Sequence, residues 1–149
     1  MNALTAVLIT VGVIAVAAAL GVILRSSQGR RRASDGSVFH PGDLPGLHEV
    51  ASGATLVQFS TQFCTTCPST RRLLKKLTQE RDGLGYVDVD LTEDRDLATR
   101  LHILQTPTVF VLDPTGRLVT RFGGAPRLPE LRSVLDDLLT PSPGVETRS

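Results

Sequence analysis

An uncharged apolar segment near the start of the chain limits its architecture more than any other feature. Residues 3–24 (ALTAVLITVGVIAVAAALGVIL) form a run of 22 residues without a charged side chain. As an α-helix the run would be about 33 Å long, which matches the roughly 30 Å hydrocarbon core of a bilayer. It is apolar on every face, and the polar sequence that follows could not cover it in a soluble domain. We therefore predict a transmembrane helix at residues 3–24.

A cleaved signal peptide is the alternative interpretation of this segment. Signal peptides carry a positively charged stretch before an apolar region of about 7 to 15 residues. Only Met1 and Asn2 precede the run here, the run is longer than that range, and arginines follow it. These features favour a retained anchor.

The charged residues are unevenly distributed and predict the orientation of the anchor. The net charge is +1, yet the first 32 residues hold four basic side chains and no acidic one: Arg25, Arg30, Arg31 and Arg32. Because basic residues concentrate on the cytoplasmic side of a membrane helix, we predict a single-pass protein whose main domain is cytoplasmic, with an extracytoplasmic domain as the alternative. The remaining 117 residues carry a net charge of −3, which excludes a nucleic-acid binder driven by overall positive charge.

Composition and periodicity divide the rest of the chain into three parts. Residues 25–46 are rich in Ser, Gly, Pro and charge and are predicted to be a flexible linker, while residues 141–149 (PSPGVETRS) are predicted to be a disordered tail. Residues 47–140 alternate strand and helix patterns, which predicts an α/β domain with a mixed sheet. The expected strands are 54–60, 86–90, 107–112 and 117–122, and the expected helices are 68–81, 92–102 and 128–139.

The two cysteines of the chain lie where the first of these strands gives way to a helix. Cys64 and Cys67 are three positions apart and can close a small disulfide. The free N–H groups and positive dipole at a helix N-terminus stabilise a thiolate and lower its pKa, which makes the thiol nucleophilic. We predict that Cys64 attacks a substrate disulfide and that Cys67 resolves the product.

Two alternatives to redox chemistry remain for this cysteine pair. A Cys-x-x-Cys motif is also half of a zinc site, but the other candidate ligands, His40, His48 and His102, lack the paired spacing of zinc ligands. We therefore predict no metal. A merely structural disulfide is the second alternative.

Three sequence motifs together resemble the thioredoxin superfamily, in particular its membrane-anchored bacterial members. These motifs are the strand LVQFS, the following FCTTCP, and the triplet Thr106-Pro107-Thr108, which opens a strand 40 residues after the second cysteine. The resemblance implies a thioredoxin-like fold, with a central mixed sheet flanked by helices, and no cofactor besides the redox-active disulfide. It also implies that Pro107 is a cis-proline beside the disulfide and that the backbone of Thr106 pairs with substrate. An ordinary trans-proline opening an edge strand is the alternative.

The chain departs from thioredoxin at three places that bear on its redox properties. Thr65 and Thr66 stand between the cysteines in place of Gly-Pro, and Phe63 replaces the usual tryptophan, which keeps an apolar surface for substrate without the indole N–H. Gln58 stands where thioredoxin has a buried acid, six residues before the first cysteine. An amide cannot accept the proton that Cys67 loses during resolution, so water accepts it or the step is slower.

These observations predict a membrane-tethered thiol–disulfide oxidoreductase of the protein-disulfide reductase type, active in cell redox homeostasis. Its partners would be protein disulfides and dithiols, together with the membrane, and neither nucleic acid nor metal is expected. Two alternatives are a membrane-anchored thioredoxin-fold binding or assembly module with little turnover, and a dedicated extracytoplasmic reductant like those of cytochrome c maturation.

Overall fold

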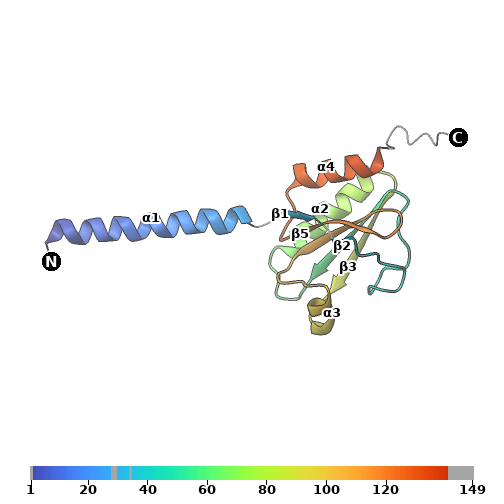
Figure 1. Ribbon diagram of the computed structural model, residues 1–149, viewed down its shortest axis with the longest axis horizontal. Coiled ribbons are helices and arrows are strands. Elements are labelled where there is room, and N and C mark those ends of the chain that lie inside the picture. Colours follow the sequence, from blue (N-terminus) through green and yellow to red (C-terminus); the bar gives the residue numbers. More distant parts are fainter. Residues whose placement is uncertain (1, 28–29, 34, 141–149) are drawn as a thin grey trace.

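The long N-terminal helix stands apart from an α/β domain (Figure 1). The computed structural model describes residues 2–27, 30–33 and 35–140, so the predicted tail at 141–149 lies outside the described residues. Helix α1 spans Ala3–Ser27, three residues beyond the predicted end of the apolar segment. Its stretch Ala3–Ile23 has a mean hydropathy of 2.8 and is not buried against the rest of the protein. By length and composition it could cross a membrane, and a signal sequence would satisfy the same criteria.

The domain is built on a five-stranded mixed sheet with the strand order β1-β5-β4-β2-β3. Its strands are β1 (Arg30–Ala33), β2 (Ala54–Ser60), β3 (Leu84–Asp90), β4 (Thr108–Leu112) and β5 (Leu118–Gly123). Strands β2 and β3 are parallel, and the other neighbouring pairs are antiparallel. The helices are α2 (Cys67–Glu80), α3 (Arg95–Arg100) and α4 (Leu128–Leu139). The mixed sheet expected from the sequence is therefore present.

Apolar side chains form a core on each face of the sheet, because alternate residues of a strand point to opposite faces. On β2, Leu56 packs with residues of α2 and α4, whereas Val57 packs in the second core, which includes Leu97 of α3. Figure 1 shows α2 and α4 lying side by side over the sheet and α3 at its other side. The central strands β2 and β4 are buried along their whole length, as expected for strands covered on both faces.

The predicted linker at 25–46 is corrected in part, because several of its residues belong to the domain. Strand β1 pairs with β5 at one edge of the sheet, and the side chains of Phe39 and Leu44 are buried in the same core as Val57. The Phe39 backbone N–H also donates a 2.8 Å hydrogen bond to the carbonyl of Gly116. The few apolar residues of this segment follow neither a helical nor a strand period, so periodicity does not detect them.

The expected elements recur with shifts at their ends. The bounds of β2 and α4 agree with the sequence prediction, whereas α3 spans only Arg95–Arg100 of the expected 92–102. Asp94 caps α3, since its carboxylate accepts a 2.9 Å hydrogen bond from the N–H of Leu97. The Thr92 hydroxyl lies before the helix, where it donates to the carboxylate of Asp90 and accepts from the backbone N–H of Gln62 at 3.0 Å.

Arg121 of β5 links the C-terminal end of α3 to the sheet through hydrogen bonds. Its guanidinium donates to the carbonyl oxygens of Leu101 and His102 at 3.2 and 2.9 Å and lies 5.0 Å from the centre of the Phe110 ring. A guanidinium is well suited to this position, because it offers several donors in a planar fork and can lie over an aromatic ring. The chain that follows α3 leads to Pro107, so this contact also positions that loop.

We expect the substitution Arg121→Met to lower the free energy of unfolding by about 1–2 kcal/mol, because it leaves two carbonyl oxygens without their donor. The measurement is urea unfolding of the full-length protein in detergent micelles, followed by circular dichroism. Arg132→Met is the matched control, since the Arg132 side chain is exposed on α4 and makes no ion pair or hydrogen bond among the described residues. Equal stability of the two variants would contradict the role given to Arg121.

Candidate active site

Cys64 and Cys67 form a disulfide at the junction between β2 and α2. Their Cα atoms are 5.4 Å apart, and α2 begins at Cys67 itself. Cys67 is only 3% exposed, whereas Cys64 lies before the helix and is partly open to solvent. An incoming group therefore meets the sulfur of Cys64 first, with Cys67 behind it.

The N-terminus of α2 provides an environment that favours negative charge on Cys64. Thr66 occupies the N-cap position, but its side chain makes no capping hydrogen bond, and the first turn contains no acidic residue. The positive end of the helix dipole is therefore not neutralised by a neighbouring side chain. The Thr66 hydroxyl lies 3.9 Å from the sulfur of Cys64, close enough to donate a weak hydrogen bond.

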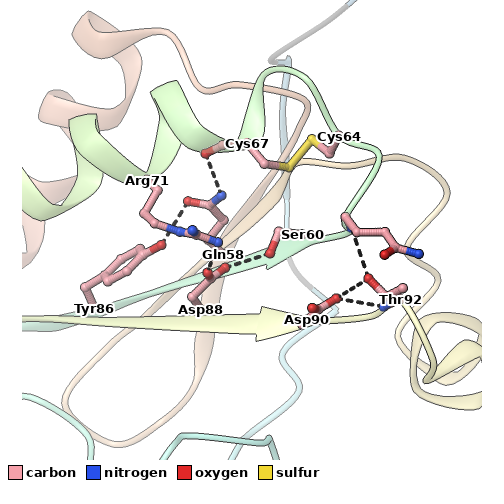
Figure 2. Close-up of polar contacts among 10 residues, drawn as sticks. Gln58, Ser60, Cys64, Cys67, Arg71, Tyr86, Asp88, Asp90 and Thr92 are labelled. Atoms are coloured by element: carbon pink, nitrogen blue, oxygen red, sulfur yellow. Dashed lines mark hydrogen bonds and ion pairs between the residues drawn. A yellow bond between two sulfur atoms is a disulfide. The ribbon is translucent and has the colours of Figure 1, made fainter.

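Gln58 of β2 links that strand to the start of α2 by a hydrogen bond, directly behind the disulfide (Figure 2). Its side chain is fully buried, and its amide nitrogen donates a 3.1 Å hydrogen bond to the carbonyl oxygen of Cys67. The amide oxygen accepts a 3.1 Å hydrogen bond from the hydroxyl of Tyr86 on β3. Both ends of the amide are thus paired, which a buried polar group requires. Gln58 acts here as a neutral positioning residue.

A charged pair lies beside Gln58 on the same face of the sheet. The guanidinium of Arg71, on α2, forms an ion pair with Asp88 of β3, and the hydroxyl of Ser60 donates to the Asp88 carboxylate at 2.8 Å. Figure 2 shows these side chains grouped beneath the disulfide, between α2 and the two parallel strands. Asp88 is the direct neighbour of Gln58 in the β2–β3 register. The two charges offset each other, so the network adds no net charge behind the cysteines.

Sequence reasoning identified Gln58 but missed Tyr86, Asp88 and Arg71. Two signals pointed to them. Tyr86 and Asp88 alternate with Val87 on β3 and so share one face, and Arg71 follows Cys67 by four residues and so lies on the same side of α2. These patterns predict on which face of the strand or helix each side chain lies. Which side chain it then contacts depends on how the strands pair.

The loop before β4 brings Thr106 and Pro107 to the same end of the sheet as the disulfide. The Thr106–Pro107 peptide bond is cis, which confirms the expected isomer. Pro107 is buried, and the hydroxyls of Thr106 and Thr61 are 3.2 Å apart, which links this loop to the chain just before the cysteines. The carbonyl of Pro107 accepts a 2.7 Å hydrogen bond from the N–H of Gly124.

The other residues singled out in the sequence lie at the surface around the cysteines. Phe63, immediately before Cys64, has 84% of its surface exposed, and Thr65 and Thr66 are also exposed. The structure therefore leaves Phe63 and the two threonines accessible to solvent.

The comparison with known families agrees with this geometry. The family model described as thioredoxin matches residues 47–137. The chain belongs to the thioredoxin family. The curated thioredoxin of Bacillus subtilis (strain 168) is 29% identical over 80 residues, which cover 53% of this chain and 77% of the relative.

Solved structures of thioredoxins share the fold. Thioredoxin f2 of Chlamydomonas reinhardtii is 24% identical, with a TM-score of 0.52 over 62% of this chain and 85% of that chain. Mitochondrial thioredoxin 3 from Saccharomyces cerevisiae in its oxidized form is also 24% identical, with a TM-score of 0.50 over 58% of this chain and 80% of that chain. In all these comparisons the matched region leaves a large part of this chain uncovered.

Family membership and the Cys64–Cys67 pair together indicate thiol–disulfide oxidoreductase chemistry. Proteins of the thioredoxin fold typically use no cofactor. No group of three or more His, Cys, Asp or Glu side chains that could hold a metal ion occurs within the described part of the chain.

Tyr86 reports on the network behind the disulfide, because it is the only tyrosine and the chain has no tryptophan. Its pKa is raised to about 12, first by burial and then by the charge of Asp88, while the hydrogen bond and charge of Arg71 oppose the rise. We expect tyrosinate absorbance at 295 nm to appear near pH 12 in the folded protein and near pH 10 in denaturant.

The same shift determines how stability depends on alkaline pH. The unfolded chain releases the phenolic proton near pH 10 and the folded protein retains it to about pH 12, so this group lowers stability progressively across that interval. Circular dichroism at each pH would establish that the protein is still folded. A midpoint near 10 in the folded protein would contradict the partly buried, hydrogen-bonded position of Tyr86 beside Gln58.

Proposed function

We propose that the protein is a membrane-tethered thiol–disulfide oxidoreductase that exchanges disulfides with protein substrates through Cys64 and Cys67. The observation that carries the proposal is the unequal exposure of the two sulfurs at the N-terminus of α2. Cys64 is accessible and lies where a thiolate is stabilised, whereas Cys67 is buried behind it. This is the arrangement needed for one attacking and one resolving thiol.

The reaction transfers two electrons in two exchange steps. The thiolate of reduced Cys64 attacks one sulfur of a substrate disulfide, which forms a Cys64–substrate bond and releases the other substrate sulfur as a thiolate that takes up a proton. The Cys67 thiol then loses its proton and attacks Cys64. The Cys64–Cys67 bond forms, and the second substrate sulfur leaves as a thiolate. The substrate is reduced and the protein oxidised; the reverse sequence oxidises a substrate dithiol.

Gln58 determines how the proton leaves Cys67. Its amide is held between the Cys67 carbonyl and the Tyr86 hydroxyl and has no basic site with which to take up a proton. Either water accepts this proton, or the second step is slower than with a buried acid. Gln58 contributes to the reaction by fixing the backbone of Cys67 relative to β2.

Thr106 is suited to hold an extended substrate segment. Neither its N–H nor its carbonyl makes a backbone hydrogen bond in the described part of the chain, and its hydroxyl faces Thr61 beside the cysteines. An extended segment that pairs with these free groups would have its cysteine near Cys64. Pairing of this kind resembles the addition of a strand to an exposed edge.

Replacement of Cys64 by serine is expected to reduce insulin disulfide reduction to the rate seen with dithiothreitol alone, because the attacking thiolate is lost. The full-length protein in detergent micelles is the material to use, since β1 and Phe39 lie before residue 47 and belong to the domain. Cys67→Ser should instead accumulate a mixed disulfide with insulin, visible on a non-reducing gel.

Lys76→Gln is the matched control, since Lys76 is exposed on α2 and pairs only with Glu80 among the described residues. It should retain full turnover. A wild-type protein no faster than dithiothreitol alone would refute the proposed exchange activity and favour a binding module that retains the thioredoxin fold.

We further propose that α1 anchors the protein in a membrane with the domain in the cytoplasm. The support is the hydropathy of Ala3–Ile23 and the four arginines that follow it in the sequence. In cells that express a Cys67→Ser variant, we expect a membrane-impermeant maleimide to label Cys64 only after lysis. The full chain should also stay in the membrane fraction after carbonate extraction.

Two results would overturn this placement. Labelling of intact cells would put the domain outside the cytoplasm and favour an extracytoplasmic reductant. A shortened, soluble product lacking residues 3–24 would instead identify the segment as a signal peptide.

A further inference from the structure

The chain enters the domain at the same end of the sheet as the disulfide. Arg30, the first residue of β1, pairs with Gly123 of β5. Gly123 also pairs with Thr108 of β4, and Thr108 pairs with Phe59 of β2, so these residues form one row across the sheet. The two cysteines follow Phe59 closely in the sequence, and Thr108 directly follows Pro107. The row therefore marks the end of the sheet that carries the redox pair.

Only two residues separate α1 from β1, since α1 ends at Ser27 and β1 begins at Arg30. Three Cα–Cα steps of about 3.8 Å span at most about 11 Å. The helix adds about 6 Å between Ile23, where the apolar stretch ends, and Ser27. With α1 in a bilayer, Arg30 therefore stays within about 17 Å of the hydrocarbon boundary. This limit follows from chain length and holds at any tilt of the domain.

The strand order extends this limit to the redox pair. Strands β1 and β2 are three strand spacings apart in the sheet, which is about 14 Å. The end of β2 therefore stays within about 30 Å of the hydrocarbon boundary, and the headgroup layer fills about 6 Å of that distance. Figure 1 shows β2 running toward the side of the domain at which α1 joins it. The loop that carries the cysteines thus lies on the membrane side, and the turn between β4 and β5 lies at the opposite end.

Exposed apolar side chains at the disulfide end agree with a position close to lipid. Outside α1, the large apolar side chains that are exposed in the described residues are Val38, Phe63 and Leu104. Phe63 precedes the first cysteine, and Leu104 lies on the loop that leads to Pro107, so both belong to the disulfide end. Val38 instead forms a β-bridge with Arg117, at the other end of the sheet. Apolar side chains are favoured at the boundary between headgroups and acyl chains.

We propose that the disulfide end of the domain faces the bilayer and that its substrates are disulfides and dithiols of integral membrane proteins, close to the membrane surface. The proposal rests on the proposed exchange function and anchor, and it narrows their substrate class. A substrate cysteine near the headgroups lies at the height of Cys64, and confinement of both partners to one bilayer raises their effective concentration. Cysteines of a domain held far from the bilayer do not share this advantage.

The test uses two transmembrane model peptides, each with one cysteine linked by a disulfide to 2-nitro-5-thiobenzoate. In the near peptide the cysteine lies about five residues beyond the apolar segment. In the far peptide it lies about 20 residues further along a continuous helix of the repeat Glu-Ala-Ala-Ala-Lys, which raises it by about 30 Å. Each peptide is reconstituted in phosphatidylcholine vesicles with the reduced full-length Cys67→Ser protein. The Cys64 thiolate bonds to the peptide sulfur, the coloured thiolate leaves, and we expect the near peptide to react about tenfold faster.

A domain displaced from the membrane should reverse this preference. Insertion of about 20 residues of the same helical repeat between residues 27 and 28 raises the domain by about 30 Å, and the far peptide should then react faster. The same insertion after residue 149 is the matched control and should keep the preference for the near peptide. The soluble disulfide 2,2′-dithiodipyridine should react equally with all three proteins. A domain that fails to fold would slow both peptides and could not reverse their order.

Energy transfer to headgroup-labelled lipid measures the position of the site without a redox step. One fluorophore is attached to Cys64 of the Cys67→Ser protein. The other is attached at the opposite end of the sheet, through Asp82→Cys in a protein that also carries Cys64→Ser and Cys67→Ser. Asp82 is exposed in the turn before β3, which makes it the matched position. We expect greater transfer from the fluorophore on Cys64.

The two measurements separate failure of the proposal from failure of the exchange function. Absence of reaction with 2,2′-dithiodipyridine would refute the exchange activity, while greater energy transfer from Cys64 would still support the membrane-facing position. Equal rates for the near and far peptides, or equal transfer from the two ends of the sheet, would overturn the proposal. Loss of the protein from the vesicles on carbonate extraction would refute the anchor and overturn the proposal with it.

Discussion

The parallel pairing of β2 with β3 is the constraint on which the site depends. Two neighbouring parallel strands cannot be joined by a tight turn, so the chain must leave the end of β2, cross one face of the sheet and return to the start of β3. Helix α2 makes this crossover, and its N-terminus therefore lies at the carboxyl end of β2. Because Cys64 and Cys67 occupy that junction, the topology alone brings them to a helix N-terminus at the carboxyl end of β2.

The crossover also explains why the interior beneath the cysteines is polar. The face of β2 and β3 that α2 covers carries Gln58, Tyr86 and Asp88 near the cysteines, and each is paired across elements. Gln58 is fully buried, so loss of its partners would cost free energy, whereas Tyr86, Asp88 and Arg71 are partly exposed. The hydrogen bonds of Gln58 join α2 to both parallel strands. The position of Cys67 is thus fixed from below, while Cys64 stays open to solvent.

Much of this arrangement follows from the sequence. The parts that could not be predicted share one physical cause. Local patterns predicted β2 and α4 with their observed bounds, and the motif pair Cys-x-x-Cys and Thr106-Pro107 located both halves of the site. Periodicity did not detect Phe39 and Leu44, whose burial depends on long-range packing. The surroundings of Gln58 also escaped prediction, because the register between β2 and β3, and not local sequence, places Asp88 beside it and brings the Tyr86 hydroxyl within reach of its amide. Contacts between distant segments are the part that one sequence leaves undetermined.

Because Gln58 is a neutral amide, it carries no charge that could act on the two cysteines. A buried acid in this position would titrate with the thiols and couple its charge to theirs. Gln58 has no charge to couple, and the adjacent Arg71 and Asp88 compensate each other. The electrostatic field acting on Cys64 is then set chiefly by the uncapped N-terminus of α2, with the Thr66 hydroxyl as a nearby donor. A helix dipole carries no titrating proton, so its contribution at Cys64 does not itself change with pH.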